Sequence, residues 1–419
     1  MSKRFVGLTK EERISFGDLI LALVFKYSEE GDKYFDSSLN DDSKSLPHIQ
    51  DEIFQDEVWK NKKTKDESEY FESLNKSPKQ IKKMLDEYMI GQSEAKKILS
   101  VAFFNHVRRI KAMEIAEHEN KECNIKKSNA LILGPTGTGK TYLVETLSKV
   151  YDLPVYCADA STITQAGFVG KNAHEVIEQL WLKSGKDIKK TERGIVFLDE
   201  IDKLATTKEG KQNSMAEGAQ QSLLKMIEGS EVEIEIGPDK SKKLTINTKN
   251  ILFVLAGAFV GLVGENTNKE SKEIGFVTSE TIKNDPKMKK IMPNDLVKYG
   301  IIPELIGRIS MIAQMHLLDK EDLEKILKNT KNNIVDQYKE LYTHDNIELK
   351  VDKKVYPQIA EKALALKIGA RSLKSIVDYL MVDKIYDIEL EGDQKTSEII
   401  LNEKYVKNQL NSYNKIEND

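Results

Sequence analysis

The sequence predicts an α/β fold, in which a large subdomain built on a parallel sheet precedes a smaller, mostly helical α+β subdomain. Two observations carry this prediction. Wholly apolar runs, such as residues 195–198 and 251–256, alternate with segments of helical periodicity, as they do when the strands of a parallel sheet are buried on both faces. After Leu317, long amphipathic segments dominate and only two short runs resemble strands.

Composition narrows the class of protein further. With 419 residues, the chain is long enough for roughly two or three domains. Its formal net charge of −4 gives no global electrostatic reason to bind nucleic acid or a membrane surface. Cys123 and Cys157 lack the spacing of a zinc site or a disulfide framework. The apolar run 19–25 is too short to span a bilayer and has no cleavage-like site, so we expect a cytoplasmic location.

Residues 1–77 differ in character from the rest of the chain. They are acidic from about residue 29 to residue 72, yet they also hold scattered aromatic residues. This composition leaves three interpretations open: a small folded domain with a linker, a segment that folds on a partner, and a disordered leader. We therefore treat 1–77 as a divergent N-terminal region and linker.

From residue 78 onward the expected elements follow in regular order. In the large subdomain, 78–316, we expect helices at 80–88, 93–115, 172–183, 214–227 and 293–300, strands at 130–133, 153–158, 194–198 and 251–256, and a hairpin of strands 231–236 and 244–247. In the small subdomain, 317–402, we expect helices at 319–342, 353–366 and 371–387, strands at 347–351 and 399–401, and then a frayed polar tail at 403–419.

A glycine-rich loop joins the strand at 130–133 to a helix and fits the pattern G-x-x-x-x-G-K-[ST]. Glycines let the backbone wrap a phosphate, and the loop amides lie at a helix N-terminus that favours anions. A plain glycine-rich turn is the alternative interpretation. The sequence predicts nucleoside triphosphate binding by Gly134, Pro135, Thr136, Gly137, Thr138, Gly139, Lys140 and Thr141, with Lys140 on the β/γ-phosphates and Thr141 on Mg²⁺.

Two carboxylates follow the apolar run 195–198. Parallel strands place ligands at their carboxyl ends, so Asp199 and Glu200 are expected beside the phosphate loop. Asp199 is suited to hold Mg²⁺ and Glu200 to polarise the attacking water. Two exposed acids at a strand end are the alternative, which the β/α alternation disfavours.

A series of ordered motifs runs through residues 78–402. They are IGQ at 90–92, GPTGTGKT at 134–141, ADAST at 158–162, AGFVG at 166–170, GIVFLDEIDKL at 194–204, EGAQQSLLKMIEG at 217–229, ILFV at 251–254, IPELIGR at 302–308 and GARSLKSIVD at 369–378. With these motifs, residues 78–402 resemble the ClpX-type AAA+ protein unfoldases of the Clp/Hsp100 family. The related HslU-type unfoldases share several of the motifs, but they carry a large insertion where this chain has only residues 171–193.

This resemblance implies a homo-hexameric ring that binds ATP and Mg²⁺ between neighbouring subunits. Arg308 is then expected to act as an arginine finger on the next subunit's nucleotide, and Arg371 to contact the phosphates of its own subunit, since guanidinium forms bidentate contacts with phosphate. Ile90 is expected near the adenine, and Tyr142 among the nucleotide contacts. The catalytic group thus implied comprises Glu200, Lys140, Arg308 and Arg371.

Two loops are expected to contact other proteins. Phe168 and Val169 match the pore loop that grips substrate polypeptides, although the family usually has tyrosine where Phe168 stands. Ile274, Gly275 and Phe276 resemble the loop that docks into a ClpP-type peptidase ring. The resemblance implies no protease site within the chain itself.

The sequence also departs from the family pattern. It has no cysteine before Cys123, so the family's zinc-binding N-terminal domain is expected to be absent or replaced, and substrate choice stays open. We expect an ATP-dependent unfoldase that threads polypeptides through a hexameric ring, feeding a ClpP-type peptidase. The alternative is a stand-alone chaperone that remodels protein complexes. A nucleic-acid motor is disfavoured by the aromatic pore loop and the charge balance.

Overall fold

The computed structural model describes residues 76–163, 173–208, 211–212, 214–236, 242–262, 290–343, 345, 347–388 and 397–416. Residues 1–75, the expected pore residues Phe168 and Val169, and the expected docking residues 274–276 lie outside this set. The described residues all belong to one compact unit, Tyr70–Asp419.

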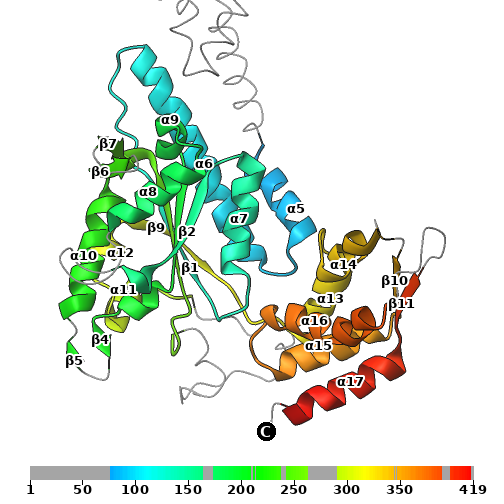
Figure 1. The fold of residues 1–419 in the computed structure, drawn as a ribbon. Coiled ribbons are helices and arrows are strands. Elements are labelled where there is room, and N and C mark those ends of the chain that lie inside the picture. Colours follow the sequence, from blue (N-terminus) through cyan, green and yellow to red (C-terminus); the bar gives the residue numbers. More distant parts are fainter. Residues whose placement is uncertain are drawn as a thin grey trace, which may run out of the picture. The chain divides into compact units, whose positions relative to one another are not determined.

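A parallel sheet of five strands organises the large subdomain (Figure 1). Every neighbouring pair in it runs parallel, which confirms the predicted fold class. The strand expected at 251–256 is the central one, as its wholly apolar sequence predicts. The spatial order is β2 (Val155–Asp159), β3 (Ile195–Asp199), β8 (Leu252–Gly257), β1 (Asn129–Leu133) and β9 (Ile309–Gln314).

Alternate residues of the central strands pack into two hydrophobic cores, one on each face of the sheet. Leu131 and Leu133 belong to one core, whereas Ala130 and Ile132 belong to the other. The first core is covered by α8 (Ala173–Lys183), α10 (Ser214–Glu228), α11 (Pro293–Tyr299), α12 (Pro303–Ile306) and the antiparallel hairpin β6 (Glu231–Ile236) and β7 (Lys242–Asn247). The second is covered by α5 (Pro78–Tyr88), α6 (Ser93–His118) and α7 (Lys140–Tyr151).

Short elements connect these layers. They are the 3-10 helices η1 (Ala160–Thr162), η2 (Ile201–Leu204) and η3 (Thr248–Asn250), the helix α9 (Ile188–Glu192), and the two-stranded pair β4 (Thr207–Lys208) and β5 (Lys211–Gln212).

The junction between α5 and α6 is fixed to the distant end of β9. The Gln92 side chain donates to the His316 backbone oxygen at 2.8 Å and accepts from the His316 backbone nitrogen at 3.0 Å. Gln92 precedes α6 with a φ of 53°, so the chain turns sharply there. This turn brings the segment 88–90 close to residues 137–142.

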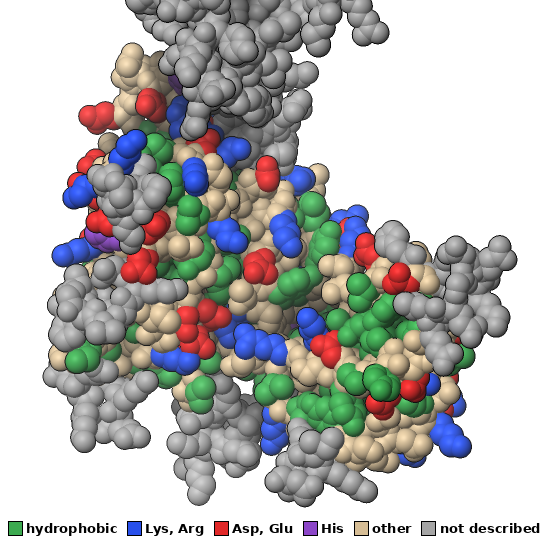
Figure 2. All heavy atoms as spheres, viewed as in Figure 1, with side chains coloured by type: hydrophobic (Ala, Val, Ile, Leu, Met, Phe, Trp, Pro, Cys, Tyr) green, Lys and Arg blue, Asp and Glu red, His purple; other side chains and the backbone are tan. Residues whose placement is uncertain are grey.

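The small subdomain has a hydrophobic core of its own. Hydrophobic side chains also gather on the face of it that Figure 2 shows. Its elements are α13 (Lys320–Asn329), α14 (Ile334–Thr343), β10 (Ile347–Val351), α15 (Val355–Ala365), α16 (Arg371–Tyr386), β11 (Ser397–Leu401) and α17 (Glu403–Ile416), with β10 and β11 paired in parallel.

Two expectations for this subdomain are wrong. The single helix predicted at 319–342 is interrupted, because Thr330 is extended and Asn332 has a φ of 58°. The Asn333 side chain then accepts the backbone N–H of Asp336 and begins α14. The tail predicted at 403–419 forms α17 instead, because Val406 and Leu410 are buried in the core.

Candidate nucleotide site at the phosphate loop

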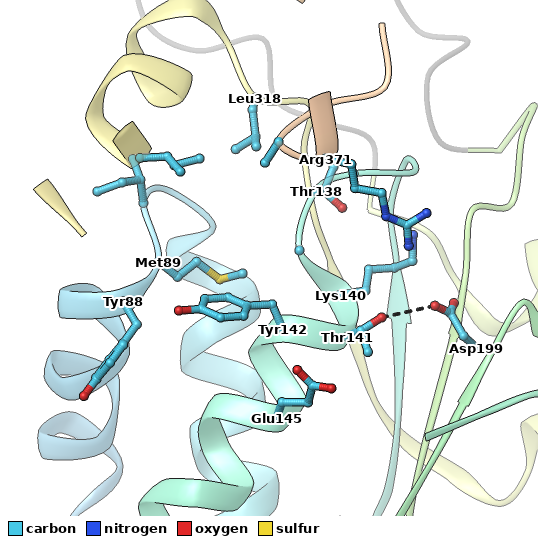
Figure 3. A pocket seen from close by; sticks show the side chains of 15 residues that line it. Tyr88, Met89, Thr138, Lys140, Thr141, Tyr142, Glu145, Asp199, Leu318 and Arg371 are labelled. Atoms are coloured by element: carbon cyan, nitrogen blue, oxygen red, sulfur yellow. Dashed lines mark hydrogen bonds between the residues drawn. The ribbon is translucent and has the colours of Figure 1, made fainter. Parts of the chain in front are cut away.

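A cavity of about 360 Å³ lies against the phosphate loop, within the size range of small-molecule sites (Figure 3). It is lined by residues of both subdomains. Asp199 lies at the carboxyl end of β3 in the large subdomain, and Arg371 lies at the start of α16 in the small subdomain. Its lining residues are Tyr88, Met89, Ile90, Gly137, Thr138, Gly139, Lys140, Thr141, Tyr142, Glu145, Asp199, Leu318, Ile326, Ala370 and Arg371.

Most sequence-predicted nucleotide contacts therefore surround one cavity. Gly134, Pro135 and Thr136 do not line it, nor do Glu200 and Arg308. Figure 3 shows the Lys140 and Arg371 side chains directed to the same end, where Thr141 and Asp199 also lie.

The glycines of the loop are required by its conformation. Gly137 and Gly139 have φ values of 79° and 94°, a region that residues with a Cβ avoid. A Cβ on Gly139 would stand 2.6 Å from Met89 Cε, and one on Gly137 would collide with the Ile368 carbonyl. The loop is thus closely packed, and Gly139 directly precedes the first turn of α7.

Lys140 is held inside the loop by the loop's own backbone. Its Nζ donates to Gly134 O at 2.8 Å and to Pro135 O at 3.1 Å, and the residue is 9% exposed. Burial lowers the pKa of Lys140, while the charge of Asp199 works in the opposite direction. Both carbonyls favour an ammonium group, so the loop carries a positive charge at its centre.

Thr141 and Asp199 meet across the gap between α7 and β3. Thr141 Oγ1 donates to Asp199 Oδ2 at 3.3 Å, and Asp199 Oδ1 accepts the backbone N–H of Glu200 at 2.9 Å. A hydroxyl and a carboxylate at this distance suit a Mg²⁺ ion that keeps several waters and phosphate oxygens as its other ligands. Among the described residues, no cluster of three or more His, Cys, Asp or Glu side chains could hold a metal alone.

Glu200 stands at a sharp bend after β3. Its φ of 59° lies in the left-handed region, and its side chain forms an ion pair with Lys203 rather than lining the cavity. The next carboxylate, Asp202, accepts the backbone N–H groups of Ala258 and Phe259, both at 3.3 Å. Asp202 thereby fastens the segment after β3 to the end of β8.

The opposite end of the cavity is apolar, and the sequence predicted only part of it. Ile90 was expected there, whereas Met89, Leu318 and Ile326 were not. These side chains come from the α5–α6 junction and from the beginning of the small subdomain, so a purine placed there would contact both. No local pattern reveals them, because the segments are more than 200 residues apart in the sequence.

A backbone hydrogen bond joins the phosphate loop to the small subdomain. Ala370 N donates to Gly137 O at 3.0 Å, one residue before Arg371. Gly369 has a φ of 66°, and a Cβ on it would lie 2.7 Å from Gly137 O. The placement of Arg371 therefore depends on direct contact between the two loops.

Arg308 lies away from the cavity. Its Nε donates to Glu228 Oε1 at 2.8 Å, and about half of its side chain is exposed. Its backbone oxygen accepts from the buried Asn129 side chain at 3.0 Å, which also accepts the Phe253 N–H. The guanidinium is thus exposed on a backbone that is firmly attached to the sheet.

Comparison with known proteins agrees with this geometry. Residues 125–312 match the family described as AAA domain (Cdc48 subfamily), and residues 318–401 match the C-terminal, D2-small domain of ClpB protein. A protein of Treponema denticola named ATP-dependent Clp protease ATP-binding subunit ClpX is 41% identical over 346 residues, which cover 79% of this chain and 81% of that protein. The chain belongs to the ClpX family of AAA+ ATPases.

Proteins of the same name from two strains of Bacteroides fragilis are 38% identical over 351 residues, covering 80% of this chain and 82% of each relative. As a ClpX-type ATP-binding subunit, the chain is an ATPase, and the cavity has the loop and the charges that ATP requires. Within the described part of the chain, no helix is both long and apolar enough to cross a bilayer.

Proposed function

We propose that the chain is an ATP-dependent protein unfoldase that threads polypeptides through a homo-hexameric ring. The observation that carries the proposal is the convergence of Lys140, Thr141, Asp199 and Arg371 on a cavity formed jointly by the large and small subdomains. Nucleotide bound there contacts both, so binding and loss of the γ-phosphate can change their angle. A cytoplasmic location goes with this proposal.

Within the site, each residue has a separate task. Lys140 and the loop amides bind the β- and γ-phosphates, and Arg371 binds them from the small subdomain. Thr141 and Asp199 would hold the Mg²⁺ that accompanies ATP, and this ion would neutralise part of the phosphate charge. Glu200 leaves Lys203 and accepts a proton from the water that attacks the γ-phosphate in line.

Arg308 completes the site of the neighbouring subunit. Its ion pair with Glu228 is partly exposed, and such pairs contribute only about 0.2–1 kcal/mol. The Arg308 guanidinium can therefore exchange Glu228 for a nucleotide phosphate of the adjacent subunit at a small cost in free energy. Exposed hydrophobic side chains on α14 and α16, including Leu341, Val382 and Tyr386, suit burial between subunits of a ring.

Replacement of Glu200 tests the hydrolytic assignment. Glu200→Gln keeps the shape of the side chain but removes the proton acceptor, so ATP binding should persist while turnover falls at least about 100-fold. Binding is measured with a fluorescent ATP analogue and turnover by phosphate release. Normal turnover in this variant would remove Glu200 from the mechanism.

The peptidase partner is tested separately, because the proposal rests on Ile274, Gly275 and Phe276 by resemblance alone. Wild type and Phe276→Ala are each mixed with a ClpP-type ring and ATP, and complexes are separated by size. Binding by wild type and not by Phe276→Ala supports a peptidase-coupled unfoldase. Binding by neither protein, with ATPase activity intact, supports the alternative of a stand-alone remodelling chaperone.

A further inference from the structure

Gln220 is a buried glutamine whose amide bonds to two separate segments of the chain. It lies on α10 and is 0% exposed. Its Nε2 donates to Leu204 O at 2.6 Å and to Gly300 O at 3.1 Å, while its Oε1 accepts the backbone N–H of Ile302 at 2.8 Å. Both amide hydrogens and the carbonyl are thus used, as burial of such a polar group requires.

These partners belong to two segments of functional interest. Leu204 is the last residue of η2, which follows directly after Asp199 and Glu200. Gly300 and Ile302 lie immediately before α12, and α12 is followed by Gly307 and Arg308. Gln220 therefore connects the segment after the expected catalytic carboxylate with the segment that carries the outward-facing arginine.

The first of these connections has further support. Gly300 O also accepts the Thr206 backbone N–H at 2.8 Å and the Thr206 hydroxyl at 3.1 Å. Thr206 lies two residues after Leu204, so the chain that leaves η2 contacts Gly300 directly as well as through Gln220. The end of η2 cannot move away from Gly300 without breaking these bonds.

The second connection is short and stiff. Gly307 N bonds to Pro303 O at 2.9 Å, and Arg308 N bonds to Leu305 O at 3.1 Å. Ile302 O in turn accepts the N–H groups of Leu305 and Ile306. One turn of hydrogen-bonded backbone thus separates Ile302, which bonds to the Gln220 amide, from Arg308.

We propose that Gln220 is a positioning residue that couples the hydrolytic segment of one subunit to the arginine which that subunit presents to its neighbour. When Glu200 and η2 shift with the nucleotide, the amide carries the shift to Ile302 and so to Arg308. This inference rests on the proposed function, because it requires Arg308 to act on a neighbouring subunit. The competing view is that Gln220 only fills space in the core and forms hydrogen bonds with backbone groups that would otherwise be unpaired.

If Gln220 positions Arg308, its replacement in one subunit should slow ATP hydrolysis in the neighbouring subunit. If Gln220 only fills the core, hydrolysis in the neighbouring subunit should not change. Donor subunits carry Glu200→Gln and cannot hydrolyse ATP themselves. They are mixed in large molar excess with wild-type subunits, and phosphate release per wild-type subunit is measured at saturating ATP. Four donors are compared. One carries Glu200→Gln alone, and each of the other three carries Glu200→Gln together with one further substitution: Gln220→Met, Gln221→Met or Arg308→Ala.

Gln220→Met keeps the side-chain volume and removes all three hydrogen bonds. Gln221 is the matched control, because it is the adjacent residue on α10 and is exposed. We expect the Gln220→Met and Arg308→Ala donors to lower turnover of the wild-type neighbours by about threefold or more, since a misplacement of about 1 Å can cost about 100-fold. The Gln221→Met donor should match Glu200→Gln alone.

Ring formation by each donor is checked by native mass measurement. If Gln220→Met does not join rings, Gln220→Asn replaces it, because a shorter amide still satisfies part of the network. The inference would be overturned if the Arg308→Ala donor lowers ATP turnover of the wild-type subunits but the Gln220 donor leaves it unchanged. No effect of Arg308→Ala would contradict the shared-site part of the proposed function instead, and absence of hydrolysis in wild-type rings would contradict the function itself.

Discussion

His106 shows how a single buried side chain makes the stability of this fold depend on pH. It lies on α6, is almost fully buried, and its Nε2 is 3.0 Å from Arg193 O. A carbonyl only accepts, so the Nε2 atom of His106 carries a proton and donates it to Arg193 O. Burial lowers the pKa of His106 to about 4, although its hydrogen bond with the Arg193 carbonyl opposes the shift.

The sign of the effect follows from proton binding. Between pH 6.5, the ordinary value, and about 4, the unfolded chain binds a proton at this residue that the native chain does not. Stability is therefore lost as the pH falls through this window. We expect the denaturant midpoint of wild type to drop between pH 7 and pH 5 by more than that of His106→Gln, which keeps a donor for Arg193 O. Parallel profiles for the two proteins would contradict this assignment.

At the scale of elements, the loop at 368–371 and the phosphate loop form one contact surface. Gly369 faces Gly137 closely enough that a methyl group has no room. Arg371 lines the cavity and directly follows Ala370, which bonds to Gly137 O, so this contact positions Arg371 at the cavity.

Gly369→Ala should separate the two loops. The Cβ would oppose Gly137 O at 2.7 Å and strain a left-handed residue, at a cost of about 1–2 kcal/mol before the clash is added. We expect weaker ATP binding, measured with a fluorescent analogue. Gly185→Ala is the control, because Gly185 has a φ of 75° but open space around it, so it adds strain without the clash. Equal ATP affinity in both variants would show that the contact does not matter for binding.

Sequence patterns predicted those parts of the site that are local in the chain. The phosphate loop, Asp199 and Arg371 each belong to a short contiguous motif beside an element boundary, and all three meet at the cavity. Met89, Leu318 and Gln220 could not be predicted in this way, because their environment is created by segments distant in sequence. The interruption at 330–333 was missed because apolar spacing continues across it, although Asn332 and Asn333 are residues that favour turns.

At the scale of the whole molecule, the cavity joins subdomains that have separate hydrophobic cores. Ligand that contacts both should stabilise them together. A saturating, non-hydrolysable ATP analogue at about 100 times its Kd is expected to add about 2.7 kcal/mol.

Arg371→Ala should reduce this stabilisation, because Arg371 is a cavity contact from the small subdomain. Lys374→Ala is the control, since Lys374 is exposed on the same helix, one turn later, and does not line the cavity. Thermal unfolding of each protein is followed with and without the analogue. Equal shifts of the melting temperature in both variants would argue against phosphate contact by Arg371.

The strand β9 connects Arg308, which we propose acts on a neighbouring subunit, with the phosphate loop of the same chain. Arg308 immediately precedes it and Met315 immediately follows it, and Met315 N bonds to Leu133 O at 2.7 Å beside Gly134. Five of the six residues of β9 pair with β1, with a register shift between Ile309 and Met311, and the strand spans roughly 20 Å between Arg308 and Met315. The Arg308 guanidinium is therefore connected through one strand to the residue that precedes the phosphate loop of the same chain. The arginine that we propose serves a neighbouring site is thus also linked to the nucleotide site of its own chain.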